Sequence, residues 1–286
     1  ATGGVDYLQS ANKAMNFAKM SLLPGPAPGS LYLNDAGKGK LGGAGLGLIA
    51  LSYRIRFDNG AGKEDAEGLA NYILSQQNED GSYESYLKIT GKEQKGSVSL
   101  YYPGEAILGL MKLYEIDKNQ RWLDSAKRGA KWLIASQRAM KSLPPDAWLV
   151  QALEALHKAG PQPEYLEHAI ALSLSMAGKQ YKLDSKNNPV FKLNSVQASA
   201  RAEGLAAGWR MARAAGDASE TRLGKAVQHT ARFLLNNQYG PKEDFPEPEL
   251  AAGGFWTTAK NGNPEIRIDN VQHSISALLH LADEMK

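Results

Sequence analysis

The sequence predicts an all-α protein built from helical hairpins. Apolar residues recur at three- and four-residue steps over most of the chain, and strand patterns are few and short. Helices with one polar face alternate with helices that are apolar nearly all round, which is typical of buried helices. Hairpins of this kind can close into a ring, with the buried helices inside and the surface helices outside. An open solenoid of hairpins is the alternative, although a solenoid usually has a tighter repeat.

The predicted surface helices share an apolar stripe opposite a charged face. In residues 63–77 the stripe includes Leu69 and Ile73, and Glu64 and Asp65 face water. The other predicted surface helices are residues 5–22, 120–137, 164–177 and 219–236.

The predicted buried helices follow these in strict alternation. They are residues 41–51, 103–114, 146–156, 196–211 and 269–281. The pattern predicts one domain, residues 5–286, with about five hairpins that form an incomplete barrel or a six-hairpin ring with one irregular member.

Four long connections each lead from the end of a surface helix to the start of a buried helix. In a ring they emerge on one face, and connections of that length are usually functional. They are residues 23–40, 78–102, 181–195 and 239–268. Short extended pieces are expected at residues 98–101 and 189–193.

Composition and charge exclude several classes of protein. The chain has 286 residues, of which 43% are hydrophobic, and no apolar run approaches the ~20 residues of a membrane-spanning helix. We therefore expect no integration into a membrane. The net charge is +3 with basic and acidic residues interspersed, so we also expect no nucleic-acid partner.

The absence of cysteine removes disulfides, thiolate metal sites and thiol nucleophiles. It suits an oxidising space such as a bacterial periplasm, which we favour over the cytoplasm. Because the chain begins at Ala1 without an apolar leader, a signal or an upstream region is expected to have been removed, and the chain to be part of a larger secreted or multidomain system.

Several segments resemble the α/α-toroid proteins. Tyr101-Tyr102-Pro103-Gly104-Glu105-Ala106, followed by residues 110–114 and Trp122, is similar to the hairpin unit of carbohydrate-active α/α barrels such as uronyl hydrolases and sugar epimerases. Residues 76–83, and residues 237–238 with the later Phe255-Trp256, resemble the turns from glutamine to an aromatic residue in terpenoid cyclases. The resemblance covers residues 41–281 and implies a central funnel that binds the ligand.

The chain departs from two of these groups in their catalytic motifs. It has no Asp-rich DDxxD or DxDD motif and no Asp/Cys/His zinc set, which argues against terpene cyclase and prenyltransferase activities. It also has no HExxH motif, and the dinucleotide-like glycines at residues 45–50 lack the preceding strand, so we expect no metal and no cofactor. Those glycines instead allow another helix or a substrate to approach closely.

The candidate catalytic residues are polar groups near the starts of buried helices. Glu105 follows Pro103 in a first turn, where its carboxyl can complement the helix dipole or serve as a general acid with Glu203 or Asp269 as base. Asp269 also reads as a helix N-cap, and His273 lies on the same face four residues later, where it can transfer protons or be a core histidine.

The candidate substrate-binding residues are aromatic and charged groups expected beside this funnel. Arg201 would hold a carboxylate or form a structural ion pair, and Asp146 would act in binding or cap its helix. Aromatic rings suit the apolar face of a sugar, although several are equally suited to the core. The aromatic candidates are Tyr86, Tyr101, Tyr102, Trp148, Phe255 and Trp256.

These observations favour a carbohydrate-active protein that acts on a glycan or a uronic-acid polysaccharide, as a glycoside hydrolase or as an epimerase or lyase. Two alternatives remain open. One is a non-catalytic toroid that binds a glycan or peptide as an accessory module, and the other is an isoprenoid-binding toroid.

Overall fold

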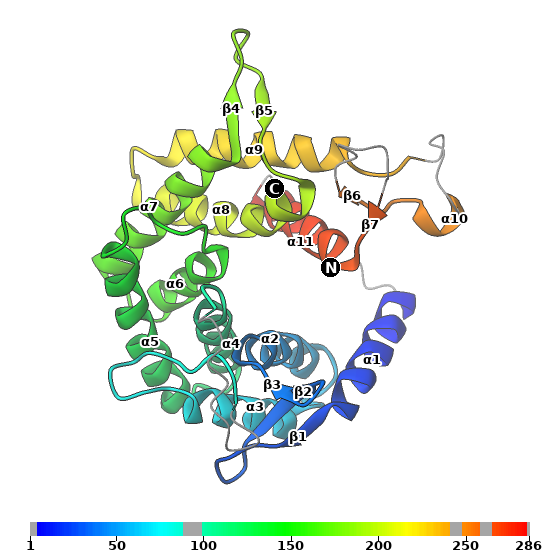
Figure 1. Cartoon of the computed structure of the whole chain (residues 1–286), viewed down its shortest axis with the longest axis vertical. Coiled ribbons are helices and arrows are strands. Elements are labelled where there is room, and N and C mark those ends of the chain that lie inside the picture. Colours follow the sequence, from blue (N-terminus) through cyan, green and yellow to red (C-terminus); the bar gives the residue numbers. More distant parts are fainter. Residues whose placement is uncertain (1–4, 88–98, 241–247, 258–264, 285–286) are drawn as a thin grey trace. The chain divides into compact units, whose positions relative to one another are not determined.

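The computed structural model describes residues 5–87, 99–240, 248–257 and 265–284, and its helices pack into two compact units. Unit 1 comprises residues 1–140 with 158–160, and unit 2 comprises residues 141–157 with 161–286. Each unit is built from hairpins of one buried and one more exposed helix, as the alternation of apolar patterns predicts (Figure 1).

Unit 1 contains five helices and a small antiparallel meander among its described residues. The elements are α1 (Val5–Met20), β1 (Leu22–Pro24), β2 (Leu31–Asp35), β3 (Lys38–Gly39), α2 (Leu41–Phe57), α3 (Lys63–Ser75), α4 (Tyr102–Asp117) and α5 (Gln120–Arg138). The strands pair in the order β1-β2-β3 with Leu22 opposite Leu33 and Asn34 opposite Gly39. The predicted connection 23–40 is therefore a folded sheet rather than an open loop.

The core of unit 1 is the contact between α2 and α4. A Cβ atom at Gly45 would lie 2.6 Å from the Glu105 carbonyl oxygen, and one at Gly109 would lie 2.7 Å from the Gly45 carbonyl oxygen. Because real Cβ atoms do not approach that closely, both positions require glycine. The contacts advance in the same direction along both helices, so α2 and α4 are parallel here. The prediction that the glycines of residues 45–50 admit a neighbouring helix is confirmed at Gly45.

Unit 2 contains the remaining helices and two short hairpins. The elements are α6 (Ala147–Ala159), α7 (Pro163–Gln180), β4 (Tyr181–Leu183), β5 (Pro189–Phe191), α8 (Ser195–Ala215), α9 (Glu220–Asn236), α10 (Pro248–Ala251), β6 (Trp256–Thr257), β7 (Glu265–Ile266) and α11 (Ile268–Glu284). The strand predicted at residues 189–193 is present as β5, which pairs with β4, and this hairpin extends beyond α9 in Figure 1. Among residues 98–101, the described residues 99–101 form no strand.

Three buried helices of unit 2 are parallel neighbours, with α8 between α6 and α11. A Cβ atom at Gly204 of α8 would lie 2.6 Å from the Ala147 Cα atom of α6. Further along the same pair, the Arg210 guanidinium donates two hydrogen bonds to the Glu154 carboxylate, at 2.7 and 2.6 Å. On the other side, α8 packs against α11.

Helix α11 differs from the prediction of a helix buried on every side. Ile275 and Leu279 are 47% and 46% exposed, although Ser274 and Ala277 are buried. The described residues of unit 2 therefore cover only one face of α11. The sequence pattern could not show this, because isoleucine and leucine contribute the same apolar pattern whether or not a neighbour covers them.

The two turns from glutamine to an aromatic residue have the same local construction. Gln77 forms an isolated antiparallel bridge with Tyr83 in unit 1, and Gln238 forms one with Phe255 in unit 2. Both aromatic rings are buried, with Tyr83 6% and Phe255 2% exposed. Each turn thus folds an aromatic side chain back into the core next to the end of an outer helix.

No helix among the described residues is long and apolar enough to cross a membrane.

Candidate functional site

Glu105 lies in the first turn of α4, as predicted, and is 8% exposed. A Cβ atom at Gly42, in the first turn of α2, would collide with the Glu105 Oε2 atom and with the Tyr102 ring. The missing side chain at Gly42 therefore makes the space that this carboxyl group occupies.

Two tyrosines and a lysine lie near the starts of α2 and α4, beside Glu105. The rings of Tyr86 and Tyr102 meet edge to face with centroids 5.9 Å apart. Backbone pairing between Lys40 and Tyr86 holds them at the start of α2, where the Lys40 ammonium also forms an ion pair with Asp35. Burial, followed by the neighbouring Tyr86, raises the pKa of the Tyr102 phenol, which therefore stays protonated and able to donate a hydrogen bond at neutral pH.

Tyr101 is the N-cap residue of α4 and is 41% exposed, so its side chain is accessible. Unit 1 thus brings together the predicted residues Glu105 and Tyr102 with Tyr86, and adds Lys40, which the sequence analysis did not single out.

The second group of predicted residues meets in unit 2. The His273 Nδ1–H group of α11 donates a hydrogen bond to Glu203 Oε2 of α8 at 2.9 Å, and their side chains are 15% and 4% exposed. The Trp148 ring of α6 meets the imidazole edge to face, with centroids 5.8 Å apart. Gly204 allows the first turn of α6, which carries Trp148, to approach α8 at this level.

This geometry gives the imidazole a defined chemical role. A carboxylate that accepts the Nδ1 proton fixes the tautomer, so that Nε2 of neutral His273 carries a lone pair. The same carboxylate stabilises the imidazolium after Nε2 has taken up a proton. Glu203 and His273 are therefore suited to proton transfer, with Glu203 orienting and His273 accepting or donating the proton.

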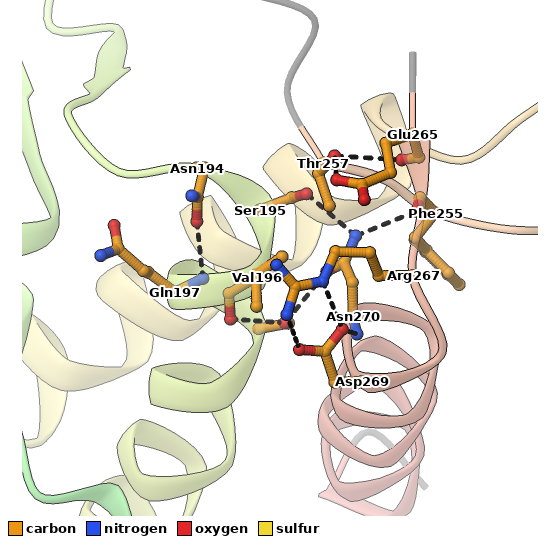
Figure 2. Close-up of polar contacts among 11 residues, drawn as sticks. Asn194, Ser195, Val196, Gln197, Phe255, Thr257, Glu265, Arg267, Asp269 and Asn270 are labelled. Atoms are coloured by element: carbon orange, nitrogen blue, oxygen red, sulfur yellow. Dashed lines mark hydrogen bonds and ion pairs between the residues drawn. The ribbon is translucent and has the colours of Figure 1, made fainter. Parts of the chain in front are cut away.

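A network around Asn270 holds α8 and α11 together one turn before this pair (Figure 2). The fully buried Asn270 amide donates hydrogen bonds to Ser195 Oγ at 3.0 Å and to the Phe255 carbonyl oxygen at 2.9 Å. It also donates to the Trp256 carbonyl oxygen at 3.0 Å, and it accepts a hydrogen bond from Ser199 Oγ at 3.2 Å. The network fixes the position of residues 255–257 against the starts of both helices.

Phe255 is a core residue and not an exposed surface for a sugar. Its ring is 2% exposed and packs with Ala198, Leu234 and Ala277. The aromatic type predicts a ring that contacts a sugar beside the funnel, but the bridge to Gln238 turns the Phe255 ring inward. Trp256 follows in β6, where its half-buried ring lies against Tyr239 with centroids 6.1 Å apart.

Asp269 occupies a different position from the predicted N-cap. Helix α11 begins at Ile268, and the backbone N–H group of Val271 donates to the Arg267 carbonyl oxygen, so Asp269 lies inside the first turn. Its carboxylate accepts two hydrogen bonds from the Arg267 guanidinium, at 3.1 and 2.6 Å. Partial burial acts to raise the pKa of Asp269, but the Arg267 hydrogen bonds, the Asn270 backbone N–H group and the charge of Arg267 together outweigh it, and the net pKa is lowered. Asp269 is therefore ionised at neutral pH and paired with arginine, not with His273 (Figure 2).

Asp146 performs the capping role that the sequence analysis weighed against binding. It is fully buried, and its Oδ1 atom accepts a hydrogen bond from the Leu149 N–H group at 3.0 Å. Arg201 is half-buried on α8, two residues before Glu203.

Sequence reasoning missed Asn270 and Arg267. Asn270 follows directly after a predicted cap residue, and a short amide at the start of a buried helix is a signal for such a network. The residues described by the structure contain no group of three or more His, Cys, Asp or Glu side chains that is placed to hold a metal ion.

Comparison with known proteins finds similar folds among solved structures. No protein-family profile and no curated protein matches the chain. Solved structures match over nearly its whole length at low sequence identity. A D-mannose isomerase superposes with a TM-score of 0.69 at 15% identity, over 99% of this chain and 82% of that one. The cellobiose 2-epimerase of Bacillus thermoamylovorans gives 0.68 at 14% identity, over 98% and 82%.

An α-mannanase of Bacteroides thetaiotaomicron gives a TM-score of 0.66 at 16% identity, over 98% of this chain and 81% of the mannanase. The fold is that of the α/α toroids. This confirms the predicted fold class, an α/α toroid of paired buried and amphipathic helices.

Proposed function

We propose that the chain is a carbohydrate-active enzyme that transfers a proton at a sugar carbon next to a carbonyl or carboxylate group, as an epimerase, isomerase or lyase does. The contact between His273 Nδ1 and Glu203 Oε2 carries the proposal, because it provides one oriented base in a half-buried site. The sugar isomerase and sugar epimerase among the similar folds support the substrate class.

In the proposed step, His273 Nε2 removes the proton from the carbon, and the electron pair of the C–H bond moves toward the neighbouring carbonyl oxygen to give an enolate. Glu203 stabilises the imidazolium that forms. Return of the proton to the opposite face of the same carbon, once the enolate has turned that face toward the imidazolium, gives epimerisation. Return to the former carbonyl carbon, with transfer of the neighbouring hydroxyl proton to the enolate oxygen, gives isomerisation. Arg201 would hold a substrate carboxylate, and Trp148 beside the imidazole would contact the apolar face of the sugar.

The test is deuterium incorporation from heavy water into D-mannose, cellobiose and trigalacturonate, followed by proton NMR. We expect exchange at the carbon next to the carbonyl or carboxylate, and we expect His273→Gln to slow it by about 10²- to 10⁴-fold, the usual contribution of a general base. Glu203→Gln should retain a weaker exchange, since the imidazole stays but loses its orienting charge. His280→Gln, on the same helix, is the matched control and should exchange at the wild-type rate.

Two results would refute the proposal. One is full exchange by His273→Gln, and the other is the absence of exchange into every sugar by the wild-type protein. Binding of sugars without turnover would then favour the accessory-module alternative.

Glycoside hydrolysis is a second candidate, and the burial of Glu105 in the first turn of α4 favours it. An α-mannanase among the similar folds is a hydrolase. The proposed partners Glu203 and Asp269 are each engaged, by His273 and Arg267 respectively, which makes this candidate the weaker one. Glu105→Gln separates the two, because it should abolish release of reducing sugar if hydrolysis is the reaction and should leave the exchange at carbon intact if proton transfer is.

A further inference from the structure

A cleft of about 450 Å³ lies in unit 2 beside the β4–β5 hairpin, and neither Glu203 nor His273 is among its lining residues. Its walls are the end of α7, strand β4 and the first half of α9. The volume falls within the range of ~300–1,000 Å³ that is typical of small-molecule sites.

The α9 wall of the cleft is basic. Arg222, Lys225 and His229 all line it, and their three- and four-residue spacing places them on one face of the helix. Among the described residues, no carboxylate lines the cleft. Across the part of the chain that the structure describes, neither Arg222 nor Lys225 forms an ion pair.

Aromatic contacts hold the opposite wall in place. The Tyr181 ring of β4 meets the His229 imidazole edge to face with centroids 5.3 Å apart, and it packs against Phe191 of β5. Phe191 in turn stacks on Phe233 of α9, with centroids 4.0 Å apart and planes 9° apart. The hairpin is thus fixed to α9.

The electrostatics of His229 agree with an uncompensated basic wall. Burial lowers the pKa of its imidazole, and the charges of Arg232 and Lys225 lower it further. A neighbouring carboxylate would have the opposite effect. The cleft therefore combines a positive field, the hydroxyl group of Thr221 and the face of a tyrosine.

We propose that this cleft is a second saccharide-binding site, which takes a carboxylate-bearing sugar. Arg222 and Lys225 bind the carboxylate, and Tyr181 contacts the apolar face of the ring. The choice of a sugar over another anion rests on the proposed carbohydrate-active function, whereas the recognition of negative charge rests on the cleft alone.

The test is titration of the full chain with trigalacturonate, read from the ring signals of His229 in proton–carbon NMR spectra and assigned with His229→Gln. We expect these signals to shift, and Arg222→Ala/Lys225→Ala to weaken the binding by at least about tenfold, because each charged hydrogen bond contributes more than a neutral one. Lys131→Ala/Lys141→Ala is the matched control, since it removes two exposed charges elsewhere and should bind like wild type. Lys225→Glu is a single variant that should abolish the shift by charge reversal.

Two further ligands define the specificity. Maltotriose, which is neutral, should leave the His229 signals unchanged at the same concentration, and sodium sulfate should bind at least about tenfold more weakly than trigalacturonate. Equal binding of maltotriose would overturn the recognition of charge, and equal binding of sulfate would overturn the assignment to a sugar. An unchanged shift in both the double variant and Lys225→Glu, or no shift in wild type, would overturn the site itself.

The same titration with His273→Gln distinguishes this proposal from the proposed function. This variant should bind trigalacturonate at His229 as wild type does, whether or not the protein exchanges deuterium into sugars.

Discussion

Replacing Asn270 by alanine removes the side chain that joins α8, α11 and residues 255–257 (Figure 2). Among the described residues, the Phe255 carbonyl oxygen accepts its hydrogen bond from this amide alone, whereas the Trp256 carbonyl oxygen also accepts one from Ser195. One buried carbonyl group is thus left unsatisfied, at a cost of ~1–3 kcal/mol, and the bonds to Ser195 and Ser199 are lost at ~0.5–1.5 kcal/mol each. We expect the free energy of unfolding to fall by about 3 kcal/mol.

The effect should reach the proton-transfer pair. Ser199 and Glu203 are one turn apart on α8, and Asn270 and His273 are one turn apart on α11, so the two interhelical contacts are successive along the same pair of helices. We therefore expect Asn270→Ala to slow deuterium exchange as well as to destabilise the protein.

Urea unfolding followed by circular dichroism measures the first effect. Gln272→Ala is the control, because this side chain is exposed on the same helix and should change the stability by less than about 0.5 kcal/mol. A loss in Asn270→Ala no larger than in Gln272→Ala would refute the role assigned to the network.

Three further predictions concern stability. Gly109→Ala should lower the free energy of unfolding by about 2–4 kcal/mol, because the new Cβ would lie 2.7 Å from the Gly45 carbonyl oxygen. Gly178→Ala should raise it by up to about 1 kcal/mol, because Gly178 lies in helix α7 and a Cβ there would meet no atom within 4 Å. Urea titrations that give both variants the same sign would contradict this. Glu154→Ala should cost about 3–5 kcal/mol, because it leaves the half-buried Arg210 charge without its carboxylate, and Glu154→Leu combined with Arg210→Met should recover much of that loss in the same assay. Folding lowers the pKa of His229 below its ordinary value of 6.5, so below that pH the unfolded chain binds more protons than the folded protein, and stability is lost toward acid. The difference in Tm between pH 7.5 and pH 5.5 should therefore shrink in His229→Gln. An unchanged difference would contradict the assignment.

The helices could be predicted from sequence because apolar periodicity reports burial directly. The pattern at residues 41–51 correctly marks the core of α2, but the helix continues to Phe57 through Arg54 and Arg56. Those two side chains reach Asp58 and Glu115 at the surface, and periodicity does not detect such pairs. The strands β1, β2 and β3 were missed because pairing of two to five residues depends on backbone geometry more than on side-chain type.

The candidate site was predicted as separate residues but not as contacts. Glu203 and His273 could each be named from helix position, yet their hydrogen bond joins residues 70 positions apart and depends on how α8 packs against α11. The capping motif at Asp269 predicts a helix that begins at Asn270, two residues after the actual start of α11 at Ile268, and the Arg267 guanidinium binds the Asp269 carboxylate instead.

The glycine at position 42 makes the carboxyl group of Glu105 sensitive to the smallest possible change on a neighbouring helix. A methyl group there would occupy the position of the Glu105 Oε2 atom, so Gly42→Ala would displace the carboxyl group without removing it from the chain. One carbon atom on α2 thus offers a way to ask what position 105 does without altering its chemistry.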